Sequence, residues 1–195
     1  MRIVELVIDD ENHPDDGVEM ISMVRDPAIE SFWVAMNSQR KQKFAEVDKE
    51  RRIVMGAAMI PDMPILREDE DGQYHVYFTK GTIRKAMELF FKRGNQGRTN
   101  YEHEQEMNGM TVVESWIIED TEKDKSALYG LANPVGTWMV SMKVDNDVVW
   151  DEFVKSGDLR GFSIEGRFRD GKTKHSKFLN ELEQVLGKYA APQVS

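Results

Sequence analysis

The sequence predicts an α+β protein that is mainly β: a small β-barrel or a strongly curved, mostly antiparallel sheet, with about three helices packed outside. Two observations support this fold class. Short segments of alternating apolar and polar residues recur along the chain between turn-forming residues. Three longer segments carry apolar residues at helical spacing instead. With 195 residues, of which 40% are apolar, the chain can form one domain, or one domain plus a small appendage.

The composition argues against several classes of function. A net charge of -9 disfavours a protein that binds nucleic acid by neutralising phosphates. No cysteine is present, which excludes disulfides, a thiolate nucleophile and thiolate metal ligands. No segment approaches the roughly 20 apolar residues of a membrane-spanning helix, and the N-terminus does not resemble a secretion signal. We therefore expect a soluble intracellular protein with no nucleic-acid or membrane partner and no cofactor.

The first half of the chain predicts five strands and one helix. The strands are expected at 2–8, 18–24, 32–36, 53–60 and 73–79. The charged segment at about 37–52 lacks periodicity and predicts a mobile excursion. Residues 80–93 predict a helix that Thr79 or Gly81 opens, because Ile83 and Met87 recur at helical spacing and Gly94 follows as a stop signal.

Asn108-Gly109 is the strongest short hairpin signal in the sequence. It joins two strand-like segments, 98–106 and 110–119. If these two residues form the turn, His103 stands directly opposite Glu114, with β-carbons roughly 4.5–5.5 Å apart. A carboxylate at that distance orients an imidazole and stabilises its charged form. A register shift of one residue would place a neighbour of Glu114 opposite His103 instead.

The second half of the chain predicts further strands at 127–132, 137–144 and 159–168, and helices at 146–155 and 178–186. We expect residues 1–170 to form the β-barrel domain and residues 171–195 to form a C-terminal helix and tail.

The last of these strands presents a serine. Phe162 and Ile164 alternate onto one face of the strand, so Ser163 lies on the other. Gly161 and Gly166 flank the serine and leave room for a close approach or a bulge. The same pattern also fits a half-buried strand on which the serine simply faces solvent.

A serine nucleophile requires a base, usually histidine, and a third group that orients the base. His103 is the histidine with a carboxylate predicted at its side. His13, His75 and His175 are more typical of surface or packing residues in their surroundings. Whether His103 can reach Ser163 depends on the tertiary fold.

Spacing disfavours two other kinds of catalytic site. A nucleophile elbow has Gly-x-Ser-x-Gly at a strand-to-helix turn, whereas Glu165 occupies the place of the second glycine. The acidic residues around His103 are of metal-ligand type, but no second histidine lies at helical spacing. Strand alternation also separates Glu102 and Glu104 from His103. We therefore predict no metal site.

Six short motifs occur in order along most of the chain. They are 21–29 (ISMVRDPAI), 60–65 (IPDMPI), 100–104 (NYEHE), 114–116 (ESW), 134–139 (PVGTWM) and 161–166 (GFSIEG). Each is weak alone. Together they resemble the prohead proteases of tailed phages, in particular the XkdF-like phage serine proteases.

The resemblance implies a serine endopeptidase with the herpesvirus assemblin fold, a small β-barrel ringed by helices. Such enzymes act inside immature proheads in the host cytoplasm. They cleave scaffold protein, the N-terminal segment of the major capsid protein and often themselves. The family's nucleophile and base carry over onto Ser163 and His103. The third member varies within the group: Glu114 follows from the hairpin geometry, and His175 is a weaker candidate.

The resemblance leaves two questions to the structure. An oxyanion hole needs backbone N–H groups, which the turn at Gly136 and Thr137 or the region around Gly166 and Arg167 could supply.

The alternative function is a non-catalytic capsid assembly protein of the same fold that binds scaffold or capsid protein.

Two further expectations concern metal and assembly. A metal-dependent hydrolase around His103 is a third hypothesis. The presence of both Ser163 and His103 favours the protease, and assemblin-like folds lead us to expect self-association.

Overall fold

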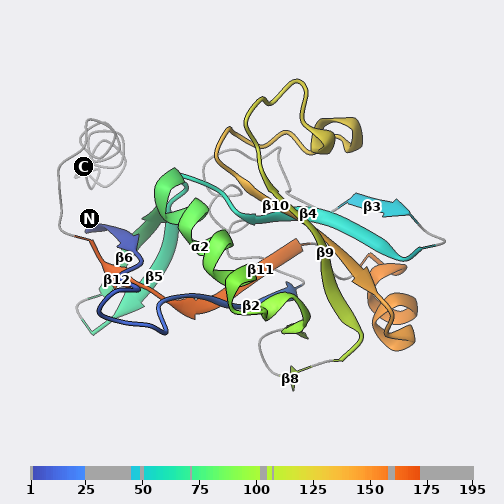
Figure 1. Cartoon of the computed structure of the whole chain (residues 1–195), viewed down its shortest axis with the longest axis horizontal. Coiled ribbons are helices and arrows are strands. Elements are labelled where there is room, and N and C mark those ends of the chain that lie inside the picture. Colours follow the sequence, from blue (N-terminus) through green and yellow to red (C-terminus); the bar gives the residue numbers. More distant parts are fainter. Residues whose placement is uncertain are drawn as a thin grey trace, which may run out of the picture.

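The described part of the chain in this computed structural model contains three sheets of four strands each (Figure 1). It comprises residues 2–24, 45–48, 51–70, 72–101, 105–106, 108–157 and 161–171. The three sheets share one apolar core, whose fully buried side chains include Phe90, Trp138 and Phe162.

The first sheet has the strand order β12-β1-β6-β5. Its strands are β12 (Arg169–Asp170), β1 (Ile3–Val7), β6 (Gly72–Phe78) and β5 (Ile65–Asp69). β1 runs parallel to β6, and β5 and β6 form an antiparallel pair from Ile65↔Val76 to Asp69↔Gly72. β5 is therefore an edge strand of this sheet in the described structure.

The second sheet is antiparallel throughout and has the order β3-β4-β10-β9. Its strands are β3 (Ala45–Asp48), β4 (Ile53–Met59), β10 (Trp138–Val144) and β9 (Met110–Ile117). Six of the seven residues of β10 are buried. This strand is buried because it lies between β4 and β9 and beneath the core-facing side of the helix.

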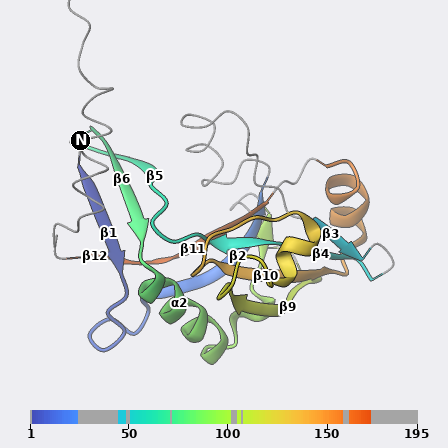
Figure 2. The same ribbon diagram turned by 90° about the horizontal axis from the view of Figure 1, so that it is seen from above.

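The third sheet carries the strand of Ser163 and has the order β11-β2-β7-β8. Its strands are β11 (Gly161–Arg167), β2 (Gly17–Val24), β7 (Asn100–Tyr101) and β8 (Gln105–Glu106). β11 and β2 are antiparallel, whereas β2 and β7 are parallel. β11 and β2 cross the middle of the molecule between the other two sheets (Figure 2).

The helix α2 (Lys80–Lys92) begins at Thr79, whose side chain accepts a hydrogen bond from the Thr82 N–H at 3.4 Å. Its apolar side packs against the sheets, where Phe90 meets Trp138 edge to face with ring centroids 5.5 Å apart. A π-helix, η3 (Val149–Val154), and two 3-10 turns, η1 (Asn95–Gly97) and η2 (Lys125–Tyr129), complete the helical part of the described chain.

The structure confirms an α+β chain that is mainly β, but the expected barrel with about three surrounding helices is wrong. The described strands form three open sheets, and two helices, α2 and η3, accompany them. The physical reason lies partly between β4 and β5. Pro61 and Pro64 cannot donate ladder hydrogen bonds, and Asp62 adopts a left-handed conformation (φ 56°), so the chain leaves one sheet and enters another.

The individual elements agree with expectation to different degrees. The helix at 80–93 is confirmed as α2, and the segment 146–155 is helical as η3. The strand expected at 127–132 is wrong. Asp124 accepts a hydrogen bond from the Ser126 N–H at 2.8 Å and starts η2 there, and Gly130 ends it with a positive φ of 74°.

Three expectations fall wholly or partly outside the described residues. These are the strand at 32–36, most of the excursion at 37–52, and the C-terminal helix at 178–186. Within the excursion, residues 45–48 form β3, which pairs with β4.

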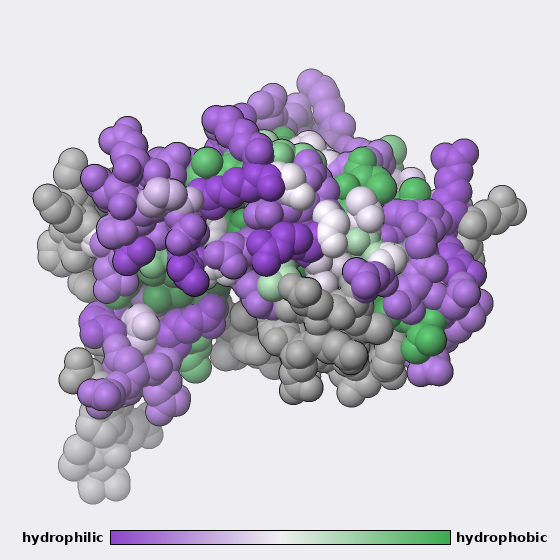
Figure 3. All heavy atoms as spheres, turned by 60° about the horizontal axis from the view of Figure 1, so that its bottom comes forward, coloured by the Kyte–Doolittle hydropathy of each residue, from purple (hydrophilic) through white to green (hydrophobic). Residues whose placement is uncertain are grey.

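The surface is predominantly hydrophilic on the face shown in Figure 3, with small apolar patches between charged residues. No helix in the described ranges has the length and apolar character required to cross a membrane. Leu128 on η2 is the most exposed large apolar side chain among the described residues, at 86%.

β11 approaches β2 so closely at Gly166 that we expect a larger residue there to destabilise the fold. A β-carbon at this position would lie 2.1 Å from the Gly17 carbonyl oxygen, a backbone atom that cannot move aside. We expect Gly166→Ala to lower the free energy of unfolding by about 1–3 kcal/mol, as overpacking does. Urea denaturation followed by tryptophan fluorescence measures this change.

Gly81→Ala is the matched control. Gly81 lies in the first turn of α2, where an added β-carbon would approach the Thr79 hydroxyl at 3.9 Å and meet nothing closer. This variant should keep its stability or gain up to about 1 kcal/mol. Equal stability changes in the two variants would contradict the packing argument.

Candidate active site

Ser163 lies near the middle of β11, which is an edge strand of the third sheet in the described structure. Its partner across the strand pair is Ser22 on β2. The preceding residue, Phe162, is 2% exposed and belongs to the main core, whereas Ser163 is only partly buried. The core therefore fixes the backbone of β11 and leaves the serine accessible at its edge.

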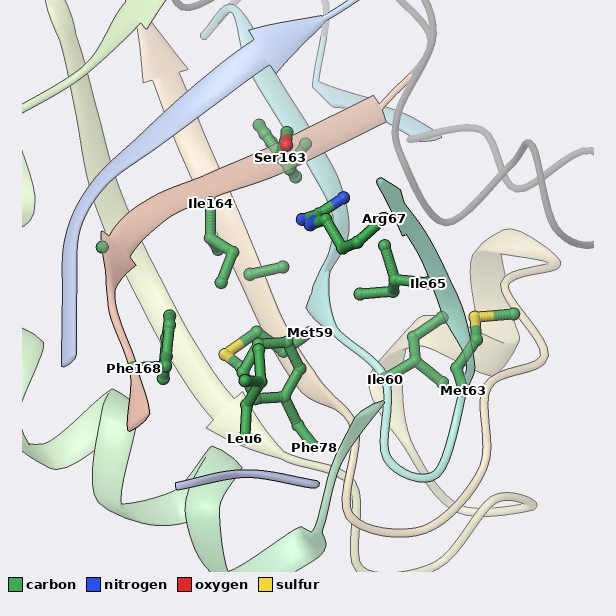
Figure 4. Close-up of a pocket in the computed structure, with 13 residues that line it drawn as sticks. Leu6, Met59, Ile60, Met63, Ile65, Arg67, Phe78, Ser163, Ile164 and Phe168 are labelled. Atoms are coloured by element: carbon green, nitrogen blue, oxygen red, sulfur yellow. The ribbon is translucent and has the colours of Figure 1, made fainter. Parts of the chain in front are cut away.

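A pocket of about 260 Å³ lies beside this strand. Its lining is mostly apolar and comes from all three sheets, through residues that include Leu6, Met59, Ile65, Phe78, Phe162 and Ile164. Ser163 lies on β11 at the rim, and Ile164 points from the same strand toward Met59 and Leu6 (Figure 4). Among the described residues that line the pocket, Arg67 is the charged residue and Ser163 is the residue with a hydroxyl group.

A polar contact accompanies Ser163 on its strand pair. The fully buried Ser22 donates a hydrogen bond from its hydroxyl to Glu165 Oε1 at 3.1 Å. Residues paired across a strand share a face, as do residues two apart. Ser22, Ser163 and Glu165 therefore lie on one face, and a carboxylate is held close to the serine. The sequence analysis did not assign a role to this glutamate.

His103 lies outside the described residues, but the backbone that leads to it is placed. Tyr101 on β7 pairs with Met23 on β2, and Met23 pairs with Phe162 on β11. With strands roughly 4.8 Å apart, Tyr101 is about 10 Å from Phe162 in the hydrogen-bonding direction. The strand that ends two residues before His103 thus belongs to the same sheet as Ser163, with β2 between them.

The hairpin predicted around Asn108-Gly109 is wrong. Tyr101 pairs with Gln105, so the pairing of β7 and β8 closes before Asn108 is reached. β9 pairs with the buried strand β10 instead. Tertiary hydrogen bonds hold the glycine in this arrangement, because the Gly109 carbonyl accepts from the Asp145 and Asn146 N–H groups at 2.6 and 3.1 Å.

Glu114 consequently does not have the strand partner that the expected hairpin gave it. Its partner across the strand pair is Ser141 on β10, and its side chain forms an ion pair with Lys125. The hydrogen bond from Lys125 lowers the pKa of Glu114 below its usual value. The register that placed Glu114 opposite His103 is therefore lost, and with it the geometric argument for Glu114 as the orienting residue.

The two candidate oxyanion regions differ in their backbone hydrogen bonds. The Gly136 N–H donates to the Ile118 carbonyl at 2.8 Å, and the Thr137 N–H donates to the Pro134 carbonyl at 3.2 Å. Both donors at that turn are thus engaged in the described structure. Gly166 lies on β11 and lines the pocket beside Ser163.

The side chain of Arg167, the other candidate in that region, lies on the surface. It faces two acidic residues, Asp15 at 3.5 Å and Glu19 at 4.0 Å. Gly166 is therefore the candidate that lines the pocket with Ser163, and the choice of oxyanion region stays a prediction.

Of the remaining histidines, the structure describes His75 and His13, and neither of them lines the pocket. His75 is buried on β6 between Ile3 and Leu66 of the adjacent strands, and His13 is exposed in the loop before β2. His175 lies outside the described residues. Within the described ranges, no group of three metal-ligating side chains is present.

The sequence analysis missed β5 and therefore the pocket. The acidic segment 68–72 predicts a turn before the strand expected at 73–79, but the preceding arm of that hairpin was not placed at 65–69. Ile65 and Arg67 are two residues apart, so a strand in this position places both on the same face.

A serine hydrolase requires an accessible serine and a base within its reach, and the described structure shows the first of these, Ser163 on an edge strand beside an apolar pocket. A family model described as "Putative phage serine protease XkdF" matches residues 41–170, and the chain belongs to this family. The resemblance to XkdF-like phage serine proteases is thereby confirmed. No curated protein and no solved structure matches the chain.

The burial of His75 leads us to expect that the stability of the fold depends on pH. Burial lowers the pKa of His75 below 6.5, so the folded state holds the neutral imidazole. Below pH 6.5 the unfolded chain binds a proton that the folded chain does not, and stability falls with a slope of up to about 1.4 kcal/mol per pH unit. Thermal unfolding of the wild type between pH 7.5 and 5.5 measures this loss.

The comparison with His75→Gln isolates this contribution, because glutamine does not titrate. We expect the stability difference between wild type and His75→Gln to shrink as the pH falls. His13→Gln serves as the control for an exposed histidine and should follow the wild type. A pH-independent difference for His75→Gln would refute the assignment.

Proposed function

We propose that this protein is a serine endopeptidase of phage capsid maturation, with Ser163 as the nucleophile and His103 as the general base. Membership of a phage serine protease family supports this function. The main structural support for this pair of residues is the strand pairing of Phe162 with Met23 and of Met23 with Tyr101. This pairing puts the chain that precedes His103 in the same sheet as Ser163.

In this proposal His103 accepts the proton of the Ser163 hydroxyl while its oxygen attacks the scissile carbonyl carbon. The C–N bond then breaks, and the imidazolium returns the proton to the leaving amine. Water hydrolyses the acyl-enzyme with the same base. Backbone N–H groups near Gly166 would stabilise the negative oxygen of the tetrahedral intermediates.

The proposed substrates are scaffold protein, the N-terminal segment of the major capsid protein and the protease itself. A phage protease with these substrates works inside the immature prohead in the host cytoplasm. The proposal includes self-association, because confinement within the prohead raises the local concentration of the chain.

Co-expression of the chain with the scaffold and major capsid proteins of its own phage tests the activity. Intact-mass measurement should detect shortened chains with the wild type and none with Ser163→Ala or His103→Ala, because loss of a serine nucleophile costs on the order of 10⁶ in turnover. Ser156→Ala, at an exposed serine in the turn after η3, is the control and should process normally. Capsids that assemble with identical masses in all variants would instead indicate a non-catalytic assembly protein.

The third catalytic residue is tested separately by Glu114→Gln. An orienting acid in a serine triad contributes about 10⁴ in turnover. Because Glu114 is exposed and ion-paired with Lys125, its loss should cost at most about 1 kcal/mol of stability, and we expect the variant to retain most of its processing activity. Lys125→Gln is the matched variant and should give the same small change. A loss near 10⁴ in Glu114→Gln alone would establish Glu114 as the third member.

A further inference from the structure

The pocket beside Ser163 has the size of one or two amino-acid side chains. Its volume of about 260 Å³ lies below the range of roughly 300–1,000 Å³ that is usual for small-molecule sites. Met59 and Phe78 lie at its base, and Ile164 lies along one wall (Figure 4). A lining of this kind gains free energy when an apolar side chain replaces water in it.

Arg67 adds a charge to this apolar lining. It is exposed on β5, and its guanidinium extends toward β11 across the mouth of the pocket (Figure 4). Its Nη1 donates to the Leu66 carbonyl at 3.2 Å. No carboxylate from the described ranges pairs with it, so its remaining donors are available to an anion.

The strands that flank the pocket are both at sheet edges in the described structure: β11 on one side and β5 on the other. An edge strand has backbone N–H and C=O groups that an extended peptide can pair with. Side chains of such a peptide alternate between two faces. A peptide along β11 would therefore pass Ser163 and direct one side chain into the pocket.

We propose that this pocket is a substrate subsite for an extended peptide that contains an apolar side chain and a nearby carboxylate. The apolar side chain fills the space between Met59, Phe78 and Ile164, and Arg67 binds the carboxylate at the rim. This assignment rests on the proposed protease function. It adds the class of sequence that the site selects.

A proteome-derived peptide library tests the selectivity of the full-length chain. The wild type should cleave sites with an apolar residue and an acidic residue at a fixed spacing, as read by mass spectrometry. Arg67→Gln should reduce the acidic enrichment about tenfold, because a hydrogen bond to a charged group is lost, and leave the apolar preference intact. Arg67→Glu should shift the enrichment to lysine and arginine.

Two further variants separate the pocket from the charge. Ile164→Phe reduces the pocket volume and should shift the apolar preference to smaller residues, with an unchanged melting temperature as evidence of folding. Arg84→Gln removes an exposed arginine on α2 that faces Glu119 at 3.7 Å, and it should leave the profile unchanged. An acidic enrichment that persists in Arg67→Gln, or an apolar preference unaffected by Ile164→Phe, would overturn the proposal.

Failure of the protease function gives a different result. Ser163→Ala, immobilised as the full chain, is incubated with the same library, and retained peptides are sequenced. Retention of peptides with the apolar and acidic pattern, lost on Arg67→Gln in the Ser163→Ala background, supports the subsite even when the wild type cleaves nothing. Retention without that pattern overturns the subsite while cleavage by the wild type still supports the protease.

Discussion

The antiparallel pairing of β11 with β2 is the contact on which the candidate site depends. It runs from Gly161↔Val24 to Arg167↔Gly17 and places Phe162 in the core, so the position of Ser163 is fixed by its neighbour. β2 also carries β7 on its other edge, which connects the serine strand to the chain that leads to His103. Without this pairing, Ser163 and the chain that leads to His103 would not share a sheet.

An ion pair between the buried Asp16 and the exposed Arg169 stabilises the start of β2. Asp16 is 0% exposed, and Arg169 Nε donates to its two carboxylate oxygens at 3.0 and 3.1 Å. Arg93, at the end of α2, donates to the Asp16 carbonyl at 2.8 Å. A carboxylate without such partners would be costly to bury. These contacts tie the helix and β12 to the beginning of β2, so the first and third sheets keep a defined relation.

The pocket exists because three sheets meet around it. Leu6 belongs to the first sheet, Met59 to the second and Phe162 to the third. The edge position of β5 and β11 keeps one side of this junction open, which joins an apolar recess to an accessible serine and an arginine.

Local sequence by itself determined α2, because amphipathic spacing and the Thr79 cap act within a few residues, and it determined the strand that presents Ser163. The motifs, including the one that contains His103, also identified the family. Only the tertiary structure decided what these strands pair with. β9 pairs with the buried β10, although Asn108-Gly109 favours a local hairpin. Pairing along a buried strand removes apolar surface from water, and the resulting gain in free energy exceeds the preference of one turn. For the same reason, the partner of Glu114 and the pocket beside Ser163 followed from contacts between segments far apart in the chain.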